Sequence, residues 1–248
     1  MTRFVLISDT HNHRPELPAG DILLHAGDLT MAGTRKETEA AMEYLAAQAR
    51  RFRHVVFIGG NHDWFLYHLG TKFTSTAVRN FVRPYGENIL YLEDEMCNVP
   101  ANDGSPIFIY GSPVQPEFGG WAWNKSRGEE IRQTWDRIPH YHPLHSIDVL
   151  ITHGPPHGML DWIGKDRVGC EELREALYLV SPKLHVFGHI HCAYGKGRAF
   201  VSGTRTTECY NASMCGEAAG DSYPLDPKRK PWVLDYDGKT FTEVPHVV

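Results

Sequence analysis

The first sixty residues alternate between short apolar runs and a polar segment with a helical period. The runs within Phe4–Ser8, Asp21–Asp28 and Val55–Ile58 have the length of buried strands. Between the second and third runs, Thr34–Glu37 matches a capping box, which predicts a helix that begins there. The apolar face of this helix is formed by Met42, Leu45, Ala49 and Phe52. The strand–helix–strand order predicts parallel strands with right-handed crossovers.

The remainder of the chain predicts a second sheet. Short runs at 89–92, 96–99 and 107–110, separated by turn residues, predict an antiparallel meander. Further strands are expected at 149–152, 185–187, 200–201, 206–210, 232–235 and 241–244, the last four completing the second sheet. Helices are expected near 65–69, at 75–82, from a second capping box at 126–129, and at 168–180. Because the 248 residues contain no linker or repeat, we expect one domain spanning residues 1–248.

Composition and charge limit the kinds of partner that the protein is expected to bind. The formal net charge is −5, so a nucleic-acid polymer is not an expected partner. Five cysteines without a Cys-x-x-Cys pair indicate neither a disulfide framework nor a zinc–thiolate site. The chain opens directly into a strand and has no apolar run of bilayer-spanning length, so we expect a cytoplasmic protein without membrane contact. His140, His142 and His145 are expected in an exposed loop.

Five of the apolar runs end in Asp, Asn or His. Independent turns would also draw on Ser, Lys, Glu and Pro, whereas a cluster of metal ligands explains the restriction. Strand ends share one edge of an open α/β sheet, so these side chains are expected to converge there. The candidate metal ligands are Asp9, His11, Asp28, Asn61, His153, His189 and His191. Two divalent ions need a shared carboxylate, for which Asp28 is the natural choice; oxygen and imidazole donors allow Mn, Fe, Zn or Co, with Mn expected in vitro.

These residues carry a resemblance to a known family. Asp9-x-His11, Gly27-Asp28, Gly60-Asn61-His62-Asp63, His153 and Gly188-His189-x-His191 resemble the complete signature of calcineurin-like metallophosphoesterases. The resemblance implies an α/β fold, a four-layer αββα sandwich in which two mixed β-sheets are flanked by helices. It also implies that one ion is held by Asp9, His11, Asp28 and His191. The other ion would be held by Asp28, Asn61, His153 and His189.

Further blocks resemble the metallophosphoesterase-domain-containing (MPPED) branch of that family. They include Gly119-Gly-Trp-Ala-Trp-Asn124, Thr152-His-Gly-Pro-Pro156 and Arg167-Val-Gly-Cys-Glu-Glu-Leu173. Some members of the branch carry Gly in place of the first His of Gly-His-x-His. This chain keeps His189, so we expect both metal positions to be filled.

The resemblance implies a dinuclear metal-dependent phosphodiesterase that acts on cyclic nucleotides or other small phosphodiesters. A metal-bridging hydroxide would attack, and His62, oriented by Asp63, would protonate the departing oxygen. Alternatively, His62 only braces its loop. Two other functions remain open: a protein Ser/Thr phosphatase, and a nucleotide-binding or scaffold protein with low turnover. The sequence does not indicate an oligomeric state.

The glycine-rich segment 111–128 holds the weaker candidates for substrate contact. Its aromatic and cationic side chains, among them Trp123, Asn124 and Arg127, either line a pocket for a base or ring or cover the core. Arg127 and His157 are the candidates for holding phosphate, the latter in a rigid Gly-Pro-Pro-His segment.

Overall fold

The computed structural model describes residues 1–139, 146–201, 205–220 and 222–245. It contains two six-stranded mixed sheets. The first has the strand order β16 (Phe241–Glu243), β15 (Trp232–Tyr236), β1 (Thr2–Ile7), β2 (Ile22–His25), β3 (His54–Phe57), β4 (Ile89–Tyr91). The second has the order β13 (Gly195–Phe200), β14 (Thr206–Asn211), β12 (Leu184–Phe187), β9 (Val149–Thr152), β6 (Pro106–Ser112), β5 (Glu95–Pro100).

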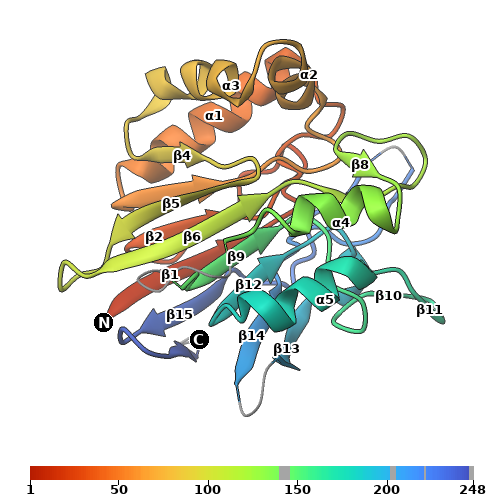
Figure 1. The fold of residues 1–248 in the computed structure, drawn as a ribbon. Coiled ribbons are helices and arrows are strands. Elements are labelled where there is room, and N and C mark those ends of the chain that lie inside the picture. Colours follow the sequence, from red (N-terminus) through yellow and green to blue (C-terminus); the bar gives the residue numbers. More distant parts are fainter. Residues whose placement is uncertain (140–145, 202–204, 221, 246–248) are drawn as a thin grey trace.

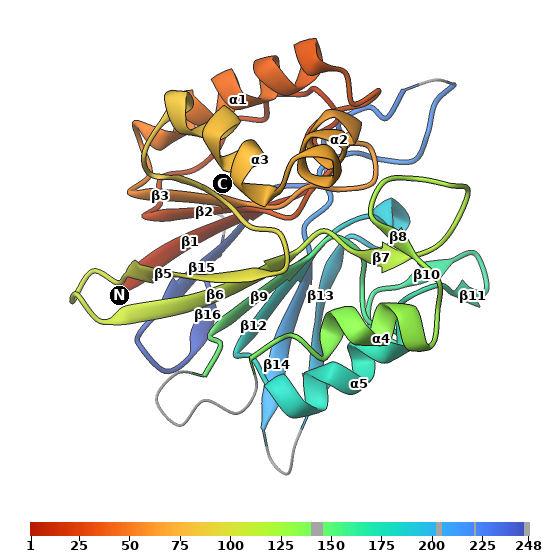
Figure 2. The same cartoon turned by 45° about the horizontal axis from the view of Figure 1, so that its top comes forward.

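Helices cover the outer face of each sheet (Figures 1 and 2). The first sheet is covered by α1 (Arg35–Ala49), α2 (Trp64–Lys72) and α3 (Ser75–Val82), and the second by α4 (Glu129–Trp135) and α5 (Glu171–Val180). Two short ribbons, β7 (Gln115–Pro116) with β8 (Asn124–Lys125) and β10 (Trp162–Ile163) with β11 (Asp166–Arg167), lie in loops. The expected four-layer α/β arrangement is therefore confirmed.

Side-chain alternation divides the core into layers. In β1, Phe4 and Leu6 belong to the apolar cluster between the two sheets, whereas Val5 and Ile7 belong to the cluster beneath the helices. Ile109 and Ile151 complete the layer between the sheets from the second sheet. Successive side chains of a strand point to opposite faces, so a continuous apolar run lets each central strand be buried on both sides. Most polar side chains of these strands therefore lie at or beyond the strand ends, although the buried His185 lies within β12.

Two predictions of strand pairing are wrong. The predicted meander is divided between the sheets, because β4 pairs in parallel with β3 while β5 and β6 form an antiparallel hairpin in the second sheet. The C-terminal strands β15 and β16 join the first sheet, with β15 antiparallel to β1. Short apolar runs do not encode which of two sheets they join, so proximity along the chain was a misleading guide.

The N-termini of three helices show which of the predicted capping boxes form and where each helix begins. Before α1, the Thr34 hydroxyl accepts from the Glu37 amide at 3.2 Å and Glu37 accepts from the Thr34 amide at 3.0 Å, which confirms the capping box. The predicted box at 126–129 does not form; Gly128 precedes α4, and the Ser126 amide donates to Glu130 instead. The helix expected from 168 begins at Glu171, because Cys170 caps it.

The histidines predicted in an exposed loop, His140, His142 and His145, lie outside the described residues. Across the part of the chain that is described, no helix combines the length and apolar character needed to cross a bilayer.

Candidate metal centre and cleft

The candidate ligands follow strands of both sheets and converge at one edge of the sandwich. Asp9 and His11 follow β1, Asp28 follows β2 and Asn61 follows β3. The imidazoles of the second sheet come from His153 after β9 and from His189 and His191 after β12. All seven side chains are buried except that of His189, which is partly exposed.

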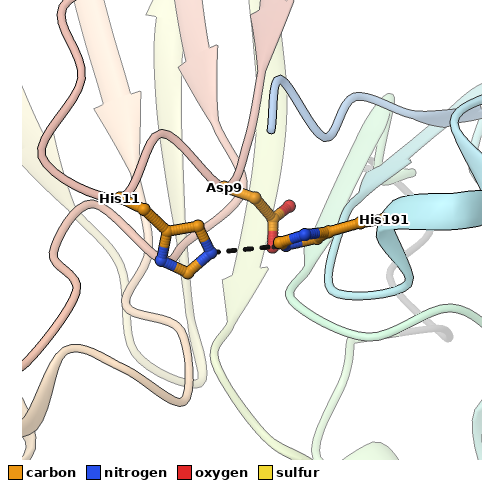
Figure 3. A group of neighbouring side chains, drawn as sticks. All are labelled: Asp9, His11 and His191. Atoms are coloured by element: carbon orange, nitrogen blue, oxygen red, sulfur yellow. Dashed lines mark hydrogen bonds and ion pairs between the residues drawn. The ribbon is translucent and has the colours of Figure 1, made fainter. Parts of the chain in front are cut away.

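Among the described residues, three groups of donor atoms form around this edge; two contain only predicted ligands, and the third joins His62 to His11 and Asp28. Donor atoms of Asp9, His11 and His191 lie within 4.8 Å of one another, and so do those of Asp28, His153 and His189. We call these the first and the second cluster. Figure 3 shows the first: the side chains of Asp9 and His11 and that of the distant His191 point toward a common centre.

Asp28 lies between the two clusters. Its Oδ2 atom is 3.8 Å from Nε2 of His11 and 3.3 Å from Nε2 of His153. Asn61 completes the second cluster, since its Oδ1 atom is 2.9 Å from the same His153 nitrogen. One carboxylate therefore reaches donors of both clusters, as a shared ligand of two ions requires.

Main-chain carbonyls fix the orientation of three imidazoles. The Nδ1 atoms of His11, His153 and His191 donate to the carbonyls of Thr30 (3.1 Å), Ala26 (2.9 Å) and Gly216 (2.7 Å). This leaves each Nε2 atom, directed at the carboxylates, as the metal-binding nitrogen. Such outer contacts are typical of histidine ligands.

The distance between two of these Nε2 atoms indicates whether a cation fits the first cluster. Nε2 of His11 and Nε2 of His191 are 3.3 Å apart. Because both Nδ1 atoms carry the proton, two lone pairs face each other unless a cation or an extra proton lies nearby. The arrangement of donors therefore fits a divalent ion at the first cluster.

The carboxylates and imidazoles of the site shift one another's pKa values. Burial opposes ionisation of Asp9, but His191 outweighs it and holds the Asp9 pKa well below its usual range. Likewise, burial is outweighed by His153 at Asp28, whose pKa is also lowered. Although burial favours neutral His153, the Asp28 charge raises the His153 pKa to about 9. The Asp28 carboxylate thus favours a positive charge beside it, whether a proton on His153 or a cation carries that charge.

The backbone at this edge is strained. Asp9 (φ 51°), His11 (φ 41°), Asp28 (φ 55°) and His189 (φ 67°) all lie in the left-handed region that residues with a Cβ rarely adopt. Such conformations cost about 1–3 kcal/mol each and cluster at functional sites. A Cβ atom at Gly188 would overlap the Asp9 carboxylate, so only glycine allows this close approach.

His62 is placed beside the metal centre. Its amide donates to Asp28 Oδ1 at 2.7 Å, and its Nδ1 atom donates to the Met31 carbonyl at 2.6 Å. The imidazole lines the cleft, with its ring 4.4 Å from that of Trp121. With Nδ1 bonded to this carbonyl, Nε2 is the ring nitrogen available to a substrate.

Asp63 does not orient His62, contrary to the prediction. Its carboxylate accepts from the amides of Leu29, Thr30 and Gly60 at 3.2, 3.0 and 2.8 Å. Burial and the Asp28 charge raise the Asp63 pKa to about 6. Asp63 therefore holds together the two turns that carry Asp28 and Asn61.

A cleft of about 890 Å³ opens beside the metal centre. Of the predicted substrate contacts, Arg127 and His157 line it. The other two do not: Trp123 is 6% exposed and donates from Nε1 to Glu93, and Asn124 donates to the Phe118 carbonyl.

The aromatic side chains that do line the cleft are Phe118, Trp121 and Tyr223. Trp121 belongs to the glycine-rich segment, but the pattern there did not distinguish the tryptophan that faces the cleft from the buried one. Tyr223 belongs to no recognisable motif, and only its position in the fold reveals it.

Comparison with known proteins defines the class. Residues 2–193 match the family model described as calcineurin-like phosphoesterase, so the fold and site are those of metal-dependent hydrolases of phosphoesters, with a dinuclear divalent metal centre. The chain belongs to this family. It is 38% identical to metallophosphoesterase domain-containing protein 1 of Homo sapiens over 254 residues, 94% of this chain and 71% of that protein.

The protein of the same name from Mus musculus is equally similar, at 38% identity over the same shares. Among solved structures, the phosphopantetheinyl hydrolase of Mycobacterium tuberculosis superimposes with a TM-score of 0.52 and 16% identity, covering 85% of this chain and 88% of that one. This likeness shows the shared fold.

Proposed function

We propose that the protein is a two-metal phosphodiesterase that hydrolyses cyclic nucleotides or other small phosphodiesters. The observation that carries the proposal is the placement of Asp28 between two sets of donors, directly beside a cleft that His62 also lines. Two ions would neutralise charge on phosphoryl oxygens and activate water at neutral pH. The cleft of about 890 Å³ has the size of a small-molecule site.

Charge at the cleft favours a diester over a monoester. Among the described residues that line it, both guanidinium groups are already engaged. Arg127 donates to the carbonyls of Gly169 and Val168 at 2.9 and 2.7 Å, and Arg167 pairs with Asp161 at 2.9 Å. A phosphomonoester dianion carries one more negative charge than a diester and would gain more from a free cationic side chain beyond the metals. The monoanionic diester depends less on such a group.

The chain's own residues supply proton transfer and orientation. His62 donates through Nδ1 to a carbonyl, so a protonated Nε2 would give its proton to the departing oxygen of the diester. Trp121 packs against the His62 ring at 4.4 Å and fixes its plane. Phe118, whose ring is 5.0 Å from that of His189, provides an apolar surface for a base or other ring on the substrate.

The test is a substrate panel with the purified protein and added Mn²⁺. The panel contains bis-p-nitrophenyl phosphate, p-nitrophenyl phosphate, and 2′,3′- and 3′,5′-cyclic nucleotides. We expect kcat/KM for the aryl diester to exceed that for the monoester, and His189→Ala to lose most of this activity. His68→Ala is the matched control, because His68 is exposed and its ring packs against the rings of Trp64 and Tyr67, away from the metal ligands.

Two results would contradict the proposal. A higher kcat/KM for the monoester would favour a phosphatase. Tight binding of mononucleotides without turnover of any ester would favour a nucleotide-binding protein.

A further inference from the structure

A segment near the C-terminus contacts each member of the first cluster. We call residues 212–226 the strap, of which residue 221 is not described. The Ser213 hydroxyl donates to Asp9 Oδ2 at 2.8 Å, and the Gly216 carbonyl accepts from His191 Nδ1 at 2.7 Å. The ring of Tyr223 stacks on that of His11, with centroids 4.6 Å apart and planes at 25°.

The strap is itself fixed to the loop that carries Asp9 and His11. The Ser8 amide donates to the Ala212 carbonyl and the Met214 amide donates to the Ser8 carbonyl, each at 2.9 Å. At the other end, Nε2 of His13 donates to the Tyr223 carbonyl at 2.9 Å. The strap therefore holds the first cluster from a rigid support.

The second cluster lacks this support. Among the described residues, no hydrogen bond or ring contact joins the strap to Asp28, Asn61, His153 or His189. The contacts of the strap are thus selective for one of the two metal positions. The strap also lies beyond residues 2–193, the part of the chain that matches the family model.

We propose that the strap is a positioning element for the metal ion held by Asp9, His11 and His191. The inference rests on the metal centre of the proposed function and adds a selective support for one position. Ser213 fixes the Asp9 carboxylate, Gly216 fixes the tautomer of His191, and Tyr223 fixes the ring plane of His11.

Tyr223 has a second effect, because it covers the cluster on the cleft side. Its ring meets the rings of His191 and His62 edge-on, at 4.7 and 5.8 Å between centroids. This cover keeps water from one side of the imidazoles. Outer contacts of this kind typically change metal affinity by about 10- to 100-fold.

The experiment is calorimetric titration of the metal-free full-length chain with Mn²⁺. We expect Ser213→Ala and Tyr223→Ala each to weaken one binding event by about tenfold or more and to leave the other unchanged. Tyr223→Phe keeps the stacked ring, so it should bind both ions with affinities like those of the unmodified chain. Ser222→Ala is the matched control, since Ser222 is exposed in the same strap and its hydroxyl donates to the Ala219 carbonyl rather than to a metal ligand.

Thermal unfolding of the metal-free variants shows whether they fold, and Tyr223→Leu replaces Tyr223→Ala if the smaller side chain prevents folding. Unchanged affinities in both Ser213→Ala and the Tyr223 variant would overturn the inference, and so would equal weakening of both binding events. Because the readout is metal affinity, a failure to hydrolyse phosphodiesters would contradict the proposed function without altering this result.

Discussion

Nε2 of His11 and Nε2 of His191 lie 3.3 Å apart, although these residues are 180 positions apart in the sequence. Their Nδ1 atoms donate to the carbonyls of Thr30 and Gly216, so the fold directs both lone pairs to one point. Beside them, Oδ1 of Asp9 lies 3.2 Å from Nε2 of His191. The fold thus directs these metal donors to a common point.

The first prediction concerns the shared carboxylate. Asp28→Asn keeps the shape of the side chain but removes the charge that faces His11 and His153. We expect both ions to bind at least about 100-fold more weakly, because loss of a ligand exceeds the effect of losing an outer contact. Metal analysis after dialysis measures this. Loss of a single ion with the other retained would show that Asp28 is not shared.

The second prediction concerns His62. Replacing it with Asn should lower kcat by about 10²–10⁴-fold for substrates with a poor leaving group, because proton transfer to the departing oxygen is lost. The loss should be smaller for p-nitrophenyl esters, whose leaving group needs no proton. Metal content should stay at two ions. If one ion is lost instead, His62 is a ligand rather than a proton donor.

The sequence predicts the positions of the metal donors because strand ends are among its strongest signals. Asp9, Asp28 and His153 each stop an apolar run, and parallel strands place such ends at one edge. The hydrogen-bond donors to Asp63 could not be predicted from the sequence. The position of Asp63 next to His62 in the chain does not determine which amides its buried carboxylate contacts. The Leu29 and Thr30 amides that it meets belong to the turn after β2, whereas the Gly60 amide belongs to its own turn.

The sequence also did not show which of the two sheets each strand joins. The run at β4 is as apolar as the strands of either sheet, so its parallel pairing with β3 depends on the helices that connect them. Likewise, nothing local to Trp232–Tyr236 indicates that this strand lies beside β1. Tyr223 reaches the cleft only because β15 returns the chain to the first sheet, so its role depends on the same long-range pairing.

The third prediction concerns Gly188. An alanine there would place its Cβ against the Asp9 carboxylate and the Ser8 side chain, both of which are buried. We expect Gly188→Ala to reduce the free energy of unfolding by about 1–3 kcal/mol, as overpacking of a core does. Urea unfolding of the metal-free protein measures the change. Gly195→Ala is the control, because its Cβ would meet other atoms at 3.4 Å or more; equal effects of the two variants would contradict the prediction.

The fourth prediction concerns pH. His185 is fully buried, and burial lowers its pKa from 6.5 to about 3. The unfolded chain therefore binds a proton that the folded chain does not, so stability is full above pH 6.5 and falls as the pH drops toward 3. From pH 7 to pH 5 this residue should cost about 2 kcal/mol of unfolding free energy.

Urea unfolding at the two pH values tests this for the unmodified chain and for His185→Asn, which does not titrate. The difference between pH 7 and pH 5 should shrink in the variant, even if the variant is less stable at both. An unchanged difference would show that His185 does not contribute to acid sensitivity.

Two ions are expected to share Asp28 at the edge where both sheets end. Crystals grown with Mn²⁺ and measured at wavelengths where manganese scatters anomalously would locate these ions. We expect two anomalous peaks about 3.5–4 Å apart, one on each side of the Asp28 carboxylate. A single peak, or peaks away from Asp28, would contradict this expectation.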